Sequence, residues 1–251
     1  MAHNQDGDHH HGGSDTTAVE PAAVSVTSPV SHRLTVTGLL LLTFGTGMID
    51  AISVLILGHV FVANMTGNVV FLGFWFAQQN VVDMTAAVVA FVSFLSGAVL
   101  GGRFSRHLQH DTRRWVTLAL AVECALLLTL SILAGTGVLD YHDDTKLILI
   151  AGLAVAFGSQ NATARQFGIQ ELSTTVLTST IVGFGVDSRL AGGKGERGTL
   201  RVSVVVTMCA GAVVGATLSR FMVAPVIATV AALVATTAVL FWFGPPDPVD
   251  D

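Results

Sequence analysis

Residues 45–73 read Gly45-Thr-Gly-Met-Ile-Asp-Ala-Ile-Ser-Val-Leu-Ile-Leu-Gly-His-Val-Phe-Val-Ala-Asn-Met-Thr-Gly-Asn-Val-Val-Phe-Leu-Gly73. The segment is hydrophobic enough to lie in a bilayer, yet it contains a carboxylate (Asp50) and two amides (Asn64 and Asn68). In hydrocarbon each of these groups is costly unless a partner or water satisfies it. The cluster therefore predicts a functional site inside a membrane protein.

The composition of the whole chain agrees with this class of protein. Of its 251 residues 51% are hydrophobic and only 12% are charged, and the mean hydropathy is +0.68. These values are typical of proteins that cross the membrane several times. No basic patch is interleaved with aromatic residues, so nucleic acid is not an expected partner. Cys124 and Cys209 lie in apolar runs without metal-ligand spacing, and we expect them to be packing residues, with no cofactor.

Both ends of the chain are polar. Residues 1–33 lack the basic start and adjoining apolar core of a signal peptide, and we predict a disordered cytoplasmic tail. The tail contains His9-His10-His11, but a histidine triplet in a flexible tail binds metal mostly adventitiously, so no metal site is expected. Residues 244–251 form a short acidic tail, because the prolines after Gly244 cannot continue a helix.

Six apolar runs are long enough to cross a bilayer, which takes roughly 20 residues. The predicted spans are residues 34–57, 84–102, 115–133, 147–166, 200–218 and 222–243. Two further runs, residues 60–77 and 172–186, are interrupted by polar residues or short and rich in threonine. Whether these two runs cross decides the topology.

Lysines and arginines indicate the topology, because those in short loops stay in the cytoplasm. If all eight runs cross, the 12 positive residues divide equally between the two sides. If the two broken runs return to the side they entered, only Lys146 and Arg220 lie outside. We therefore predict an all-α polytopic inner-membrane protein with six full transmembrane helices, two re-entrant or half-depth segments and a cytoplasmic N-terminus.

The second half of the chain resembles the first. The aligned pairs are Gly47-Met-Ile-Asp-Ala51 with Gly158-Ser-Gln-Asn-Ala162, Leu72-Gly73 with Phe184-Gly185, and Gly97-Ala-Val-Leu-Gly101 with Gly211-Ala-Val-Val-Gly215. Residues 34–135 and 147–243 are therefore predicted as two membrane repeats. Each has three full crossings, so the repeats are inverted, an arrangement typical of secondary transporters. The alternative is that apolar sequence of low complexity aligns with itself by chance.

The motifs of residues 47–73 also carry a family resemblance. Asp50-Ala51, Phe61-Val-Ala-Asn-Met-Thr-Gly-Asn68 and Leu72-Gly73 resemble the YoaK-like family of bacterial inner-membrane proteins, a domain of unknown function. The resemblance covers roughly residues 34–243. It implies a bacterial membrane protein with several spans and leaves the substrate open.

The first repeat contains the strongest site candidates. An intramembrane carboxylate can take up and release a proton, so we interpret Asp50 as a proton or cation coupling site. The alternative is a structural carboxylate that binds neighbouring backbone. Asn64, Thr66, Gly67 and Asn68 interrupt the second apolar run, and we expect them to contact a polar solute. The alternative is a helix break that satisfies its own polar groups.

In the second repeat Asn161, next to Gln160, is the counterpart of Asp50. Arg165 shares a helix face with Asn161 and is a candidate partner for Asp50 or an anionic substrate, although a position near the cytoplasmic end also favours snorkelling. Thr175 and Thr178 offer hydroxyl groups to a solute, and the alternative is that they only pack. Glu123, in the middle of a span, is a second and weaker candidate for protonation.

The leading hypothesis is a secondary transporter of an unidentified small polar or amphipathic solute, coupled to protons through Asp50. A passive channel or a structural membrane protein is the alternative. An enzyme is not expected, because the chain lacks a phosphate-binding loop motif and a membrane-embedded histidine that could act as a base. Small residues such as Gly97 and Gly211 would allow close helix packing within one chain or in a homo-oligomer.

Overall fold

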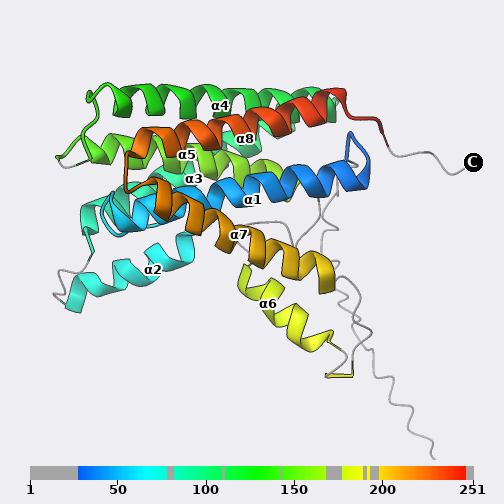
Figure 1. The fold of residues 1–251 in the computed structure, drawn as a ribbon, viewed down its shortest axis with the longest axis horizontal. Helices are drawn as coiled ribbons and strands as arrows, with labels where there is room; N and C mark the ends of the chain where they lie inside the picture. Colours follow the sequence, from blue (N-terminus) through cyan, green and yellow to red (C-terminus); the bar gives the residue numbers. More distant parts are fainter. Residues whose placement is uncertain are drawn as a thin grey trace, which may run out of the picture.

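The computed structural model describes residues 28–77, 82–108, 111–141, 143–167, 177–188, 191–192 and 198–246. Within these ranges the chain is helical and contains no strand (Figure 1). The elements are α1 (His32–Leu55), α2 (Met65–Gly73), the 3-10 helix η1 (Phe74–Ala77), α3 (Met84–His107), α4 (Thr112–Gly135), α5 (Lys146–Arg165), α6 (Leu177–Val186), α7 (Gly198–Leu218) and α8 (Val223–Phe243).

Six of these helices, α1, α3, α4, α5, α7 and α8, are long and apolar enough to cross a membrane. Each overlaps one predicted span, with ends that differ by a few residues. By contrast, α2 has 9 residues and α6 has 10, so at about 1.5 Å per residue neither can cross a hydrocarbon core of about 30 Å. The prediction of six full spans and two half-depth segments is confirmed.

The helices pack in a pattern that repeats between the two halves. α1 packs on α7 and α8, as α5 packs on α3 and α4, and α2 packs on α3 as α6 packs on α7. The remaining large contact, between α4 and α8, joins equivalent helices of the two halves. Figure 1 shows α2 and α6 at opposite ends of the bundle. Exchanging the halves thus maps the first six contacts onto one another in pairs and maps the contact between α4 and α8 onto itself.

Glycines make the two central pairs possible. A Cβ atom on Gly47 of α1 would lie 2.3 Å from the carbonyl oxygen of Met208 on α7, and one on Gly158 of α5 would lie 2.2 Å from that of Phe94 on α3. Only a residue without a Cβ fits such an approach. The aligned glycines on the facing helices are equally close: Gly211 would meet Phe44, and Gly97 would meet Val155. The segments aligned in the sequence therefore occupy equivalent places.

Arg113, in the first turn of α4, binds both the residues just before α1 and the residues at the end of α8. Its guanidinium donates hydrogen bonds to the carbonyl oxygens of Trp242 (2.7 Å), Gly244 (2.8 Å) and Pro29 (2.9 Å). The start of α1 and the end of α8 therefore lie at one end of the bundle, as an even number of crossings requires. We call this the termini end.

The predicted N-terminal tail extends to residue 33, but the structure already describes the chain from residue 28. Val30 is fully buried, and the N–H group of Ser31 donates to the carbonyl oxygen of Pro245 (2.9 Å). Packing against the end of α8 thus fixes the residues that precede α1. The rest of the predicted N-terminal tail, including its histidine triplet, lies outside the described residues.

Candidate functional site

Asp50 lies in the last two turns of α1, and only 5% of its surface is exposed. Its Oδ1 accepts hydrogen bonds from the backbone N–H groups of Val62 (3.1 Å) and Ala63 (3.0 Å). Its Oδ2 accepts a hydrogen bond from the side-chain amide of Asn64. Both carboxylate oxygens are therefore engaged by the loop that joins α1 to α2, and they hold this loop against α1.

The loop reaches Asp50 because the chain reverses directly after α1. Gly58 and His59 have positive φ angles of 135° and 60°, a conformation that glycine adopts freely and histidine adopts in tight turns. The reversal carries Val62 and Ala63 back into the core, where both are fully buried. Their N–H groups need an acceptor there, and the carboxylate of Asp50 provides it.

Asn68 closes the same loop from α2. Its Oδ1 accepts a hydrogen bond from the N–H group of Phe61 (2.8 Å), and its Nδ2 donates to the carbonyl oxygen of Phe61. A Cβ on Gly67 would lie 2.5 Å from the ring of Phe61, so glycine is needed beside this contact. The amides of Asn64 and Asn68 thus bind the protein itself, while Thr66 is exposed on α2.

The counterparts in the second repeat are placed differently. Asn161 is buried, and its Nδ2 donates to the carbonyl oxygen of Phe157 one turn earlier (2.9 Å). Gln160 is also buried. Thr178 is exposed on α6, and Thr175 lies outside the described residues.

Arg165, a candidate partner for Asp50 in the sequence, does not approach it in the structure. Asp83 links the C-terminal end of α1 to the first residue of α5, because its N–H group donates to the carbonyl oxygen of Gly58 (3.3 Å) and its carboxylate pairs with Lys146 (2.9 Å). Arg165 is the last residue of this 20-residue helix, about 30 Å from Lys146. It is exposed there, as snorkelling requires.

Asp83 itself caps α3 at the end of the bundle opposite the termini end. Its Oδ1 accepts a hydrogen bond from the N–H group of Ala86 (3.1 Å). Burial alone would raise the pKa of Asp83, but the hydrogen bonds from Lys146 and Ala86 and the charge of Lys146 lower it below the ordinary value of 3.8. The pair joins the two repeats at this end.

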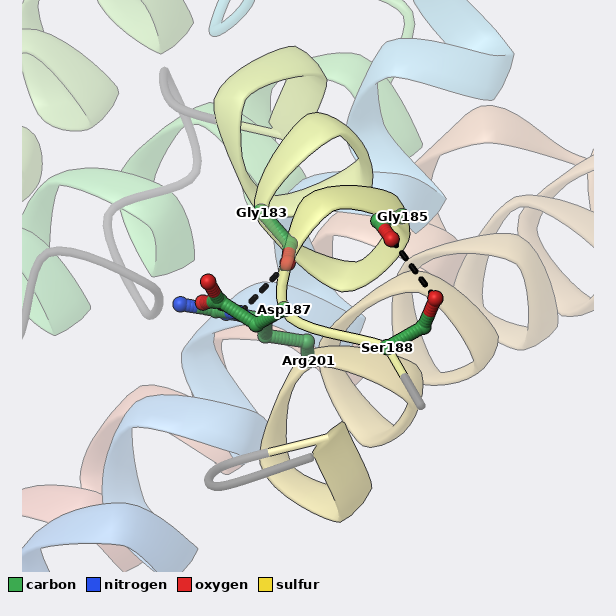
Figure 2. A network of polar contacts seen from close by, with 5 residues as sticks. All are labelled: Gly183, Gly185, Asp187, Ser188 and Arg201. Atoms are coloured by element: carbon green, nitrogen blue, oxygen red, sulfur yellow. Dashed lines mark hydrogen bonds and ion pairs between the residues drawn. The ribbon is translucent and has the colours of Figure 1, made fainter. Parts of the chain in front are cut away.

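Arg201 on α7 binds the end of α6 (Figure 2). Its Nη1 donates to the carbonyl oxygen of Gly183 (2.7 Å) and to Oδ2 of Asp187 (2.5 Å). Ser188 adds a hydrogen bond to the carbonyl oxygen of Gly185 (2.7 Å). Arg201 is not among the site residues predicted from the sequence. The sequence does contain a signal for this ion pair, because Asp187 directly follows one apolar run and Arg201 lies at the start of the next.

The described side chains of the site act through hydrogen bonds and ion pairs. Within the part of the chain that the structure describes, no three His, Cys, Asp or Glu side chains gather in a group that could hold a metal ion. The site thus contains two half-depth helices. The loop before α2 is held by the buried carboxylate of Asp50, and the end of α6 is held by the guanidinium of Arg201.

Comparisons with known proteins agree with this architecture. The family model described as "Protein of unknown function (DUF1275)" matches residues 38–240. The UPF0700 transmembrane protein YoaK of Bacillus subtilis (strain 168) is 32% identical over 196 residues, which cover 73% of this chain and 83% of that protein. No solved structure matches. The chain therefore belongs to the DUF1275 family, whose function is unknown.

Proposed function

We propose that the protein is a secondary transporter of a small polar or amphipathic solute, with α2 and α6 as gates on opposite sides of the membrane. The observation that carries the proposal is the pair of half-depth helices at equivalent places in two repeats. Such paired broken elements in inverted repeats frame the solute path of many transporters. Tight glycine contacts between α1 and α7 and between α3 and α5 would let each pair move as a unit.

Asp50 is the proposed coupling group of the first gate. As a carboxylate it accepts hydrogen bonds from Val62, Ala63 and Asn64. Protonation turns one oxygen into a donor and removes acceptor capacity. The loop that precedes α2 would then lose part of its attachment to α1, so proton uptake would free the gate.

The proposed solute contacts differ in how available they are. Thr66 on α2 and Thr178 on α6 are exposed, so their hydroxyl groups can bind a solute without breaking the described structure. Asn64 and Asn68 already bind the protein and would contact a solute only when the loop opens. Asn161 and Arg165 belong to the second half of the proposed path.

The distribution of charge supports an inner-membrane protein with a cytoplasmic N-terminus. Among the described lysines and arginines, only Lys146 and Arg220 follow α4 or α7 and so lie at the end opposite the termini end. The others flank helix ends at the termini end, where Arg113 itself lies. Positive residues in short loops favour the cytoplasmic side, which would place the termini end there.

The test is a thermal-stability screen of the detergent-purified protein with a panel of small polar and amphipathic metabolites at acidic and neutral pH. A ligand that binds the folded state raises its apparent stability. Stabilising compounds are then assayed for uptake into proteoliposomes with and without a pH gradient, using wild type and Asp50→Asn. We expect gradient-driven uptake that Asp50→Asn abolishes. Flux that ignores the gradient would indicate a channel instead.

A further inference from the structure

Two buried polar side chains have no role in the proposed gates. Glu123 on α4 and Gln160 on α5 are each 4% exposed. The Oε1 atom of Glu123 and the Nε2 atom of Gln160 are buried without a hydrogen-bond partner among the described residues. Leaving such a group unsatisfied is destabilising because its desolvation is not compensated, so a buried acceptor and a buried donor of this kind need an explanation.

The two side chains lie at the same depth in the bundle. α4 and α5 pack against each other in opposite directions, because Trp115 near the start of α4 stacks on Phe167 just after α5, with ring centroids 6.4 Å apart. Farther along, a Cβ on Gly152 would lie 2.8 Å from the side chain of Leu130. Glu123 and Gln160 both lie close to the midpoint between these two contacts.

The surroundings of Glu123 are apolar. Leu120 and Leu127, about one turn away on each side, are 1% and 0% exposed. The neighbouring Cys124 donates from Sγ to the carbonyl oxygen of Ala231 on α8 (3.4 Å). On α4 the carboxyl group of Glu123 is therefore flanked by apolar side chains and by the thiol of Cys124.

No charged side chain faces Glu123 from the middle of the packed helices. α8 contains no titratable residue. Those of α5 are Lys146 and Arg165 at its two ends, and those of α3 are Arg103, Arg106 and His107 in its last two turns. Asp50 on α1 is bound by its own loop. Among the described residues, the buried donor without a partner at the depth of Glu123 is therefore the amide of Gln160, beside the already bonded amide of Asn161 and the thiol of Cys124.

We propose that Glu123 and Gln160 form a buried proton-binding site, bridged by a water molecule. The water accepts a hydrogen bond from Nε2 of Gln160 and donates one to Oε1 of Glu123, which satisfies both groups. On uptake, a proton from water forms an O–H bond with the carboxylate. On release that bond breaks, the proton returns to water, and the water held by Gln160 donates to the carboxylate.

The site goes beyond the proposed function, because it lies apart from both gates and its occupation requires no solute. A proton taken up at Glu123 would change the charge in the packing between the two repeats, since α4 belongs to the first and α5 to the second. Proton binding at Glu123 can therefore be measured whether or not the protein transports a solute.

The probe is dicyclohexylcarbodiimide, a hydrophobic reagent that modifies protonated carboxyl groups in apolar surroundings. The full-length protein in detergent is treated over a range of pH, and the modified residue is located by mass spectrometry. We expect an adduct on Glu123 that falls about tenfold for each pH unit above the midpoint of its titration. An adduct yield on Glu123 that does not change with pH, or no adduct on Glu123 at any pH, would overturn the proposal.

Variants test the role of the amide. Glu123→Gln should remove the adduct, while Asp50→Asn should leave it. Gln160→Leu should extend labelling to higher pH, because the ionised carboxylate loses its donor. Thr117→Val is the matched control, since the Oγ1 of Thr117 on α4 is also buried without a partner in the described chain, and its labelling curve should match the wild type. If the pH dependence of labelling were unchanged in Gln160→Leu, Gln160 would not be part of the site.

Discussion

The loop after α1 and the end of α6 hold their half-depth helices by different chemistry. In the first repeat a buried carboxylate on the preceding span, Asp50, gathers the loop before α2. In the second repeat a guanidinium on the following span, Arg201, binds the last turn of α6. The equivalent of Asp50 is the neutral Asn161. Shared glycine contacts build the same backbone arrangement twice, while the buried carboxylate of Asp50 has an amide at the equivalent place in the second repeat.

The largest effect should come from removing the first of these attachments. Asp50→Ala leaves the buried N–H groups of Val62 and Ala63 without an acceptor, at about 1–3 kcal/mol each. We expect a loss of about 2–5 kcal/mol in the free energy of unfolding, measured in detergent. Asp50→Asn keeps one acceptor oxygen and should lose less. Asn161→Ala, the matched change in the second repeat, should cost less than Asp50→Ala; equal losses would remove the proposed asymmetry.

The contacts that the repeats share should respond equally. Gly47→Ala and Gly158→Ala each place a Cβ against backbone of the facing helix, and overpacking of this kind costs about 1–3 kcal/mol. We expect both variants to lower the midpoint of thermal unfolding by similar amounts. Gly73→Ala is the control, because a Cβ there meets nothing within 4 Å. If only one of the two buried glycines were sensitive, the repeats would not be equivalent.

A smaller effect is expected at the second gate. Arg201→Ala removes the donor to Gly183 and the ion pair with Asp187. Because Asp187 is half exposed, the loss of global stability should be only about 1 kcal/mol. Hydrogen exchange in α6 should nevertheless speed up while exchange in α2 stays unchanged. Faster exchange in both helices would mean that the gates are not held independently.

The smallest effect concerns the ion pair that joins the repeats. The pKa of Asp83 is lowered in the folded protein from the ordinary value of 3.8, so its contribution is complete above that ordinary value and is lost as the pH falls through the lower, folded value. The contribution should be about 0.5–1 kcal/mol, because the pair is partly exposed. Asp83→Asn should abolish this component of the acid dependence, measured by unfolding at several pH values. A variant with unchanged acid dependence would contradict it.

The spans and the repeat could be predicted because they depend on the length and hydrophobicity of each run and on the positions of glycines. Six runs have the length and hydrophobicity to cross, and Gly47 and Gly158 stand at aligned positions because both must admit a facing backbone. Asp50 was identifiable as an ionisable residue in an apolar run. Thr66 and Thr178 were chosen for their hydroxyl groups, and both are exposed in the structure.

The partners of these residues could not be predicted from side-chain chemistry. Asp50 binds backbone N–H groups, which every residue except proline offers, and the turn at His59 brings them into reach. Arg165 was paired with Asp50 by its place in the repeat, but the C-terminal ends of α1 and α5 lie at opposite ends of the bundle. Inversion of the repeats makes equivalent positions distant from one another.

The most direct test of the inverted arrangement uses Gly73 and Gly185, aligned glycines near the ends of α2 and α6 with open space for a side chain. Single Gly73→Cys and Gly185→Cys variants are made in a background with Cys124→Ala and Cys209→Ala. They are treated in intact and in permeabilised cells with a thiol reagent that cannot cross the membrane. We expect Gly73→Cys to be labelled from outside and Gly185→Cys only after permeabilisation. Labelling of both from the same side would contradict gates on opposite sides of the membrane.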